Sequence, residues 1–381
     1  MTRLTAALLA CSALFAPPAL AKSPSGAIPA AEEKRAQPVI QIAVLLDTSN
    51  SMDGLIAQAK SQLWKLVNEF SRAKHGGRTP RLEVALYEYG NDRLSKGSGY
   101  LRQVSGLTTD LDRISEQLHG LRTSGGDEYC GQVIDAATRQ LEWRSGPGTL
   151  KMIFIAGNEP FSQGSVDYKG AVKHAIEKGI IVNTIFCGPE QQGIQSGWKQ
   201  GALLADGRFS FIDANQRVAH VTAPQDDELA RLGDKLNKTY VGYGRKGAEA
   251  KKRQATQDKA AAEAGQGAGV QRALAKSKDQ YRAEDWDVVD ATAGGAAMSA
   301  VAPSALPAEL QQMPEDERRQ FVQEKAKERA EIRSRMSKLE ADRRTFVAAE
   351  EKKQTAGEAS FDDAIVESLQ EQAAKASFTL E

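Results

Sequence analysis

The stretch VIQIAVLLDTSNSMDG, residues 39–54, decides the fold of this 381-residue chain. Its first eight residues are apolar except for Gln41, and the run ends abruptly at Asp47. A continuous apolar run of this length predicts a strand buried on both faces of a parallel sheet. Beyond a polar turn, apolar residues recur at helical spacing, namely Leu55, Ala59, Leu63, Leu66, Val67 and Phe70. The stretch therefore predicts a strand, a turn rich in side-chain oxygens, and a helix.

The oxygens of this turn have a spacing that favours a shared ligand. Asp47, Ser49 and Ser51 alternate, so a looping backbone can direct all three side chains at one point. In doubly wound sheets, ligands bind beyond the carboxyl ends of the strands, which is where this turn lies. A carboxylate and two hydroxyls are hard oxygen ligands of the kind that suits Mg²⁺. The competing interpretation is a polar turn in which Ser51 or Asp53 caps the next helix.

Strands alternate with helices from Val39 to Tyr243. Further strands are predicted at 81–89, 100–104, 150–156, 180–187 and 208–213, and helices at 107–121, 133–143, 166–178 and 226–236. This alternation predicts an α/β fold with a doubly wound, mostly parallel sheet.

The Asp-x-Ser-x-Ser pattern of Asp47, Ser49 and Ser51, together with this order of elements over 39–243, resembles a von Willebrand factor type A (vWA) domain. In that family the pattern begins a metal-ion-dependent adhesion site (MIDAS), where an acidic group of a partner completes the coordination of a divalent ion. The resemblance implies Mg²⁺, Mn²⁺ or Ca²⁺ as the ion. It also implies that the protein binds a partner and does not catalyse a reaction.

The rest of the chain departs from the family pattern at two points. Asp127 follows the glycine pair at 125–126 where the family has threonine, and Gly157 stands where a strand-end aspartate is usual. Asp127 is the expected fourth ligand, directly or through water, and Glu128 is the alternative because the loop is one residue longer than usual. Asn158 would add a neutral carbonyl oxygen. The alternative is a degenerate site held by hydrogen bonds among the same groups.

The N-terminal residues 1–21 have the pattern of a secretory signal peptide, with Arg3, an apolar stretch and a final Ala-Leu-Ala. Residues 22–38 then predict a flexible leader, and we expect a periplasmic or secreted protein.

Removal of the signal leaves Cys130 and Cys187 as the only cysteines. In an exported protein such a pair predicts a disulfide, with two buried free thiols as the alternative.

After the predicted domain the composition becomes polar. Residues 244–313 contain one apolar island at Trp286, which we expect to dock on the vWA domain, but too little apolar area for a second core of ordinary size. Residues 314–353 predict a long amphipathic helix, and 354–381 a C-terminal tail. One helix stripe holds Val322, Ile332, Met336, Leu339 and Phe346, interrupted by Lys325, Arg329 and Arg343. Such a stripe packs on the same chain or forms a coiled coil with a partner or a second copy.

Composition narrows the function. The formal net charge is zero, so the overall charge of the chain does not favour binding to nucleic acid. After the signal, no segment approaches the roughly 18 apolar residues of a membrane span. No P-loop, His-Glu-x-x-His or Gly-x-Ser-x-Gly motif is present.

The leading hypothesis is an exported vWA protein that binds a protein partner or acidic ligand. Alternatives are a metal-dependent phosphoryl hydrolase using Asp47, which lacks a second acid because Ser49 stands there, and a helical-tail interaction protein with a vestigial metal site.

Overall fold

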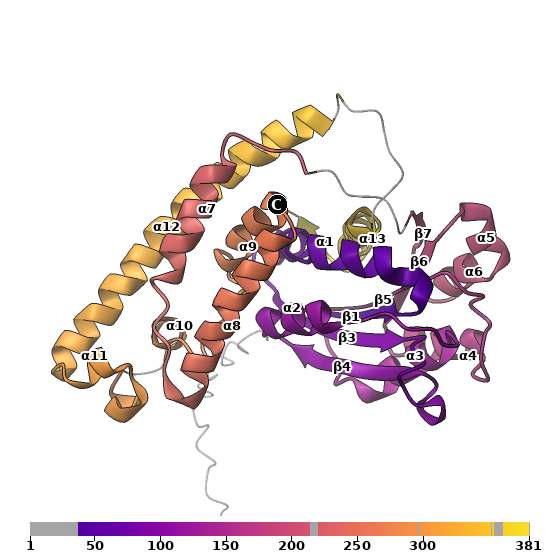
Figure 1. Ribbon diagram of the computed structural model, residues 1–381, viewed down its shortest axis with the longest axis horizontal. Helices are drawn as coiled ribbons and strands as arrows, with labels where there is room; N and C mark the ends of the chain where they lie inside the picture. Colours follow the sequence, from indigo (N-terminus) through magenta and orange to yellow (C-terminus); the bar gives the residue numbers. More distant parts are fainter. Residues whose placement is uncertain (1–36, 214–219, 296–297, 352, 354–360, 381) are drawn as a thin grey trace, which may run out of the picture. The chain divides into compact units, whose positions relative to one another are not determined.

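Strand β1 (Val39–Asp47) lies inside a six-stranded sheet in the computed structural model (Figure 1). The strand order is β4-β3-β1-β5-β6-β7, and every neighbouring pair is parallel except β3 and β4. The other strands are β3 (Arg81–Tyr89), β4 (Leu101–Thr108), β5 (Thr149–Gly157), β6 (Ile181–Cys187) and β7 (Phe209–Ile212). The predicted α/β fold with a mostly parallel sheet is confirmed.

The structure describes residues 37–213, 220–295, 298–351, 353 and 361–380. The predicted signal peptide at 1–21, almost all of the leader at 22–38 and part of the predicted tail at 354–381 lie outside these ranges. Among the helices within them, none is long and apolar enough to cross a lipid bilayer.

Helices cover both faces of the sheet, which explains why β1 is apolar without alternation. Ile40, Ile42 and Leu46 join one core with α1 (Asp53–Ser71) and α2 (Leu111–Gly120). Ala43 and Leu45 join a second core with α3 (Cys130–Gln140) and α4 (Tyr168–Glu177). Two short helices, α5 (Glu190–Gln195) and α6 (Trp198–Leu203), pack against β6 and β7.

An additional helical region follows the sheet. It comprises α7 (Asp226–Asn237), α8 (Gly244–Glu263), α9 (Gln266–Lys276), α10 (Val288–Ala293), α11 (Ala308–Gln311) and α12 (Glu315–Glu351). The region builds two small apolar cores in place of one core of ordinary size. One holds Leu229, Leu236, Tyr240, Leu274 and Met336, and the other holds Val241, Val288, Val289, Leu310 and Val322. Short apolar segments that are distant in the sequence converge here, which composition alone does not show.

The apolar island at Trp286 packs within this helical region. The indole stacks on Tyr240, with ring centroids 5.5 Å apart and planes 24° from parallel. The backbone N–H of Tyr243 donates to the Trp286 carbonyl at 2.7 Å. The island therefore docks on the segment that leaves the sheet domain, and not on the helices that flank the sheet.

The apolar stripe of α12 is covered by the same chain. Ile332, Met336 and Leu339 are buried against the first small core. Arg329, which interrupts the stripe, pairs with Asp287 at 2.7 Å and lies over the Tyr240 ring at 4.0 Å. Arg329 is thus a contact residue in its own right, and the middle of the stripe packs on the same chain, which is the first of the two arrangements that the sequence predicts.

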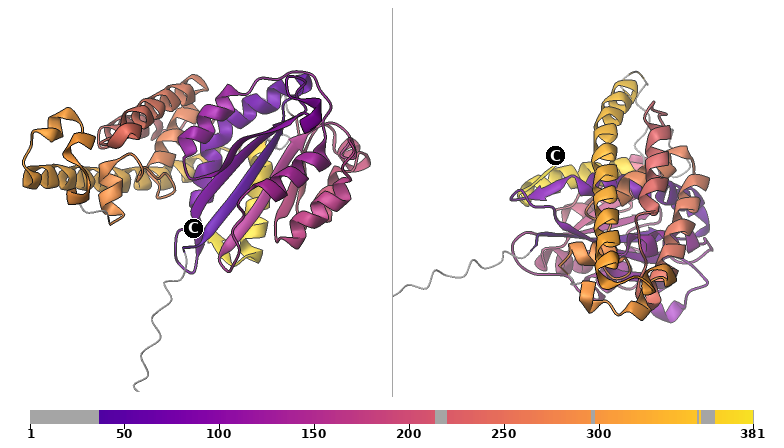
Figure 2. Two further views of the ribbon diagram at one scale, coloured as in Figure 1. Left: turned by 90° about the horizontal axis from the view of Figure 1, so that it is seen from below. Right: turned by 90° about the vertical axis from the view of Figure 1, so that its left-hand side faces the viewer.

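Residues 361–380, placed in the predicted tail, return to the sheet domain (Figure 2). Helix α13 (Phe361–Lys375) packs beside α1 and contributes Ile365 and Leu369 to the first sheet core. Strand β8 (Phe378–Leu380) pairs antiparallel with β2 (Ala73–His75), which follows α1. The helices from α7 to α12 therefore lie in sequence between the sheet and the helix that completes one of its faces.

Candidate functional site

Three neighbouring strands end at one edge of the sheet. Asp47 is in register with Tyr89 of β3, and the preceding Leu46 is in register with Ala156 of β5. The loops that follow β1, β3 and β5 consequently meet around Asp47. This meeting point is the site that the strand-end argument predicts.

The Asp47 carboxylate is fully buried and only half satisfied. Its Oδ1 accepts a hydrogen bond from the backbone N–H of Ser49 at 2.8 Å. Its Oδ2 is buried and has no hydrogen-bond partner among the described residues. Burial raises the pKa of Asp47 to about 7, the Ser49 N–H works in the opposite direction, and the charge of Glu159 raises it further. A buried acceptor without a donor is uncommon in folded proteins and marks a place where another group binds.

Two hydroxyls and an amide lie next to this carboxylate. The Oγ atoms of Ser49 and Ser51 are 3.1 Å apart, and Asn158 Nδ2 donates to Ser51 Oγ at 3.2 Å. Neither Ser51 nor Asp53 caps α1, since the helix has Met52 at its N-cap and no side-chain cap bond. The structure therefore brings Asp47, Ser49, Ser51 and Asn158 together, and the capping interpretation of the turn is wrong.

The second carboxylate beside Asp47 is Glu128 and not Asp127. Asp127 is exposed, and its Oδ2 accepts a hydrogen bond from the Tyr129 hydroxyl at 3.0 Å. Glu128 is buried, and burial raises its pKa to about 8, assisted by the charges of Asp47 and Glu159. Of the two acidic residues considered for the site, Glu128 therefore points into the protein and Asp127 points out.

Packing explains why position 157 is a glycine where the sequence comparison with the vWA family expects an aspartate. A Cβ atom at this position would lie 2.5 Å from the Tyr89 hydroxyl and 3.0 Å from Asp47 Oδ2. The Tyr89 hydroxyl donates to the Ala156 carbonyl at 3.0 Å and occupies the space that a strand-end side chain needs. An aspartate at 157 would therefore clash with Tyr89 and place a second charge against Asp47.

Tyr89, Gly90 and Glu159 belong to the site, although the sequence analysis did not select them. Gly90 has φ +75°, and a Cβ there would lie 2.8 Å from both Asp47 Oδ1 and Glu128 Cγ. Only glycine accommodates both this backbone conformation and this close approach. All three residues end or follow a strand that neighbours β1, so the strand-end argument, applied to every predicted strand, would have found them.

The predicted disulfide between Cys130 and Cys187 is not formed, and both cysteines are buried free thiols. Cys130 lies in the core with α3 and α4, whereas Cys187 lies in the core with α1 and α13. The sheet separates these two cores, so the thiols do not meet even though both elements end at the same edge. Burial raises the pKa of both thiols.

The donor set at this edge fits a hard cation. Among the described residues, no three His, Cys, Asp or Glu side chains are grouped so as to hold a metal ion. A cation here would therefore rely on the serine hydroxyls together with Asp47, and the charge of Glu128 beside Asp47 would add to its attraction. Carboxylate and hydroxyl oxygens are the ligands that Mg²⁺, Mn²⁺ and Ca²⁺ prefer.

Comparison with solved structures gives matches of low overall similarity. Protein BatB from Bacteroides thetaiotaomicron is 18% identical, with a TM-score of 0.35, over 46% of this chain and 90% of that one. The vWA domain of SpRpn10 is 14% identical, with a TM-score of 0.33, over 48% of this chain and all of that one. Proximal thread matrix protein 1 from the mussel byssus, with zinc in its MIDAS, is 14% identical, with a TM-score of 0.36, over 47% of this chain and 43% of that one.

Comparison of the sequence with protein-family models identifies the sheet domain more directly than the solved structures do. No curated protein sequence matches the chain significantly. The model of the von Willebrand factor type A domain matches residues 41–216, which run from inside β1 to just beyond β7. The matched range, the strand order and the Asp-x-Ser-x-Ser turn agree, so residues 41–216 form a vWA domain to which this chain adds a helical C-terminal region.

Proposed function

We propose that this protein is an exported binding protein whose vWA domain holds a divalent cation at Asp47 and uses it to engage an acidic group of a protein partner. The observation that carries the proposal is the buried Oδ2 of Asp47, which has no hydrogen-bond donor among the described residues. Two serine hydroxyls lie beside it and a second carboxylate, Glu128, faces the same edge.

The electrostatics support a cation at this position. Asp47 and Glu128 both have raised pKa values, mainly because burial disfavours their charged forms; the charge of Glu159 raises both further, and that of Asp47 also raises the pKa of Glu128. A divalent ion would reverse this balance, since it favours the charged forms of both groups. Asp47, Ser49 and Ser51 would hold the ion, and Asn158 and Glu128 would act through the groups next to it. The ion would supply a positive centre to which a partner's carboxylate binds.

The arrangement supports binding better than phosphoryl transfer. Asp47 has no exposed surface, and one of its oxygens is engaged by the Ser49 N–H. A carboxylate nucleophile needs an accessible oxygen. The second acid of such a hydrolase would lie two positions after Asp47, where this chain has Ser49, whose hydroxyl is 3.1 Å from that of Ser51.

The test is thermal unfolding of the full chain, freed of divalent ions, with Mg²⁺, Mn²⁺ or Ca²⁺ added separately at pH 8. A ligand that binds the native state raises the melting temperature by mass action. We expect a rise with at least one ion, and we expect Asp47→Ala to abolish it. An unchanged melting curve for the wild type at millimolar concentrations of all three ions would contradict the proposal.

The partner-binding part needs a separate measurement. Exported proteins captured by the immobilised full chain are compared with Mg²⁺ present and with the ion chelated, and Asp47→Ala serves as the matched control. We expect a partner retained only by the wild type with the ion present. A partner retained equally by all three samples would place its binding surface elsewhere on the chain.

A further inference from the structure

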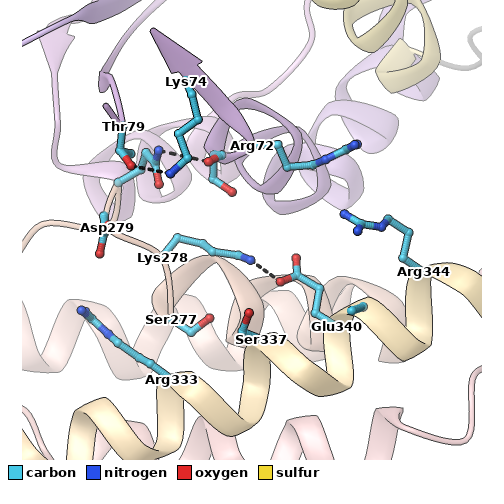
Figure 3. A pocket seen from close by; sticks show the side chains of 13 residues that line it. Arg72, Lys74, Thr79, Ser277, Lys278, Asp279, Arg333, Ser337, Glu340 and Arg344 are labelled. Carbon is cyan, nitrogen blue, oxygen red and sulfur yellow. Dashed lines mark hydrogen bonds and ion pairs between the residues drawn. The ribbon is translucent and has the colours of Figure 1, made fainter. Parts of the chain in front are cut away.

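A second pocket lies at the opposite edge of the sheet from Asp47. Helix α1 starts beside the end of β1 and runs back, so Ser71 and Arg72 at its end lie near the starts of the strands. There the vWA domain meets the loop after α9 and one face of α12. The pocket between them has a volume of about 420 Å³, within the range of small-molecule sites (Figure 3).

The wall of the pocket is strongly basic. Five cationic side chains line it against two acidic ones, and four hydroxyls complete the polar lining. The cations are Arg72, Lys74, Lys278, Arg333 and Arg344; the acids are Asp279 and Glu340; the hydroxyls belong to Ser71, Thr79, Ser277 and Ser337. This composition excludes an apolar ligand and favours an anion with more than one charge.

Three of these cations have no carboxylate partner within the described part of the chain. Lys74 donates to the Thr79 hydroxyl at 2.7 Å, and neither Arg333 nor Arg344 forms an ion pair there. Arg333 Nε is buried and lacks a hydrogen-bond partner among the same residues. By contrast, Lys278 pairs with Glu340, and Arg72 pairs with Glu69 at 2.7 Å. The pocket thus retains positive charge that the protein itself does not neutralise.

Helix termini explain only part of this charge. Arg72 follows α1 and Lys278 follows α9, where the carbonyl end of a helix favours a cation. Arg333 and Arg344 lie inside α12, so this explanation does not extend to them. On the same helix Arg329 and Arg343 are fully paired, with Asp287 and Asp226. Arg333 is the informative case, since its buried Nε lines the pocket and has no hydrogen-bond partner among the described residues, which leaves it able to donate to a ligand.

We propose that this pocket binds a phosphate-bearing small molecule with at least two negative charges. Guanidinium groups match phosphate oxygens in a forked geometry, and hydroxyls donate to the remaining oxygens. In Figure 3, Arg72 and Arg344 point towards the same side of the pocket from the two parts of the chain. A bound phosphate there bridges the vWA domain and α12.

The experiment uses the full chain and inorganic pyrophosphate as the probe, without divalent ions, measured by calorimetric titration and by thermal unfolding. We expect saturable binding and a higher melting temperature than in sodium chloride of the same ionic strength. Arg344→Gln should weaken binding about tenfold, as the loss of one charge-assisted contact does. The double variant Arg72→Gln/Arg344→Gln, which removes the two guanidinium groups that point towards the same side of the pocket, should bind no pyrophosphate.

Two controls make the result specific. Lys338→Gln removes one positive charge from α12 outside the pocket lining and should leave binding unchanged. Asp47→Ala, at the other edge of the sheet, should also leave it unchanged, which separates this inference from the proposed metal site. Absence of saturable binding, an equal loss in Lys338→Gln, or tighter binding of citrate than of pyrophosphate would overturn the assignment. Arg344 is exposed, so its variant tests the proposal even if the double variant does not fold.

Discussion

Two clusters of buried charge in this chain are built in opposite ways. Where α12 meets the helical region, Arg329 is 3% exposed, pairs with Asp287 and Asp290, and donates to the Thr239 carbonyl at 2.7 Å. At the carboxyl edge of the sheet, Asp47 is equally buried but faces other carboxylates, and one of its oxygens has no donor within the part of the chain that the structure describes. Complete pairing indicates a structural role, whereas a buried charge without a partner indicates a binding role.

Arg272 extends the structural pattern to the contact between the helical region and the vWA domain. Its guanidinium pairs with Asp112 of α2 and with Asp258 of α8 at 2.8 Å, and it lies 4.2 Å from the ring centroid of Trp64 in α1. The helical region is therefore joined to the vWA domain by buried, saturated charge. Removal of one member of such a cluster leaves the others unpaired in a medium of low polarity.

The largest effect should come from breaking the saturated cluster. We expect Arg329→Ala to lower the free energy of unfolding by roughly 3–5 kcal/mol, because Asp287 would remain buried, and Asp290 half-buried, without a cation. Urea unfolding of the full chain measures this. Arg335→Ala is the matched control, since Arg335 pairs with Glu228 at the surface and should cost at most about 1 kcal/mol. Equal losses for both variants would contradict the distinction between the two regions.

At the carboxyl edge of the sheet, removal of the buried charge of Asp47 should raise the free energy of unfolding, whereas removal of Arg329 lowers it. The folded-state pKa of Asp47, about 7, lies above its unfolded value, so the ion-free protein loses stability as pH rises from about 4 to 7. Asp47→Asn removes this penalty, and we expect it to stabilise the ion-free protein at pH 8 by roughly 2–4 kcal/mol. The gain should shrink towards pH 4. A variant that is less stable than the wild type at pH 8 would show that the carboxylate is paired after all.

A smaller effect is expected at Ser51, where a substitution should weaken ion binding without changing the stability of the fold. Ser51 is exposed, so Ser51→Ala should change the free energy of unfolding by no more than about 0.5 kcal/mol. It should nevertheless reduce the rise in melting temperature produced by the divalent ion. Ser61→Ala, in α1 and away from the site, serves as the control. A full ion response in the Ser51 variant would remove this hydroxyl from the proposed ligand set.

The smallest effect concerns the thiols. Cys130 and Cys187 are free and lie in separate cores, so a reducing agent should leave the melting temperature of the full chain unchanged. Alkylation should label both thiols only after unfolding. A drop in melting temperature on reduction would show that a disulfide forms in the purified full chain.

The sheet domain was predictable because its signals are local. The run from Val39 to Asp47 and the alternation of strands and helices fixed the class of fold, and the turn after β1 located the site. The inward turn of Glu128 and the phenol of Tyr89 beside Gly157 depend on packing between loops, which no single stretch contains. The cysteines were misread for a related reason, since the sequence shows which edge a residue approaches but not which face of the sheet it lies on.

The helical region was less predictable because its stability rests on contacts between distant segments. The arginines that interrupt the α12 stripe looked unfavourable for packing, yet Arg329 and Arg343 bind aspartates from α7 and from residues 287–290. Residues 361–380 looked like a tail because nothing nearby covers their apolar side chains. Their partners are α1 and β2, at the other end of the described chain.

The pairing of β8 with β2 determines when this protein is able to finish folding. Helix α13 and β8 complete a face of the sheet, so the vWA domain stays open on that side until residues 361–380 have left the ribosome or crossed a membrane. Contacts between residues so far apart in sequence form slowly, because a long loop must close before they contribute stability. During this interval the apolar surface of α1 is exposed to other chains. A holding chaperone that covers it would act until the last strand arrives.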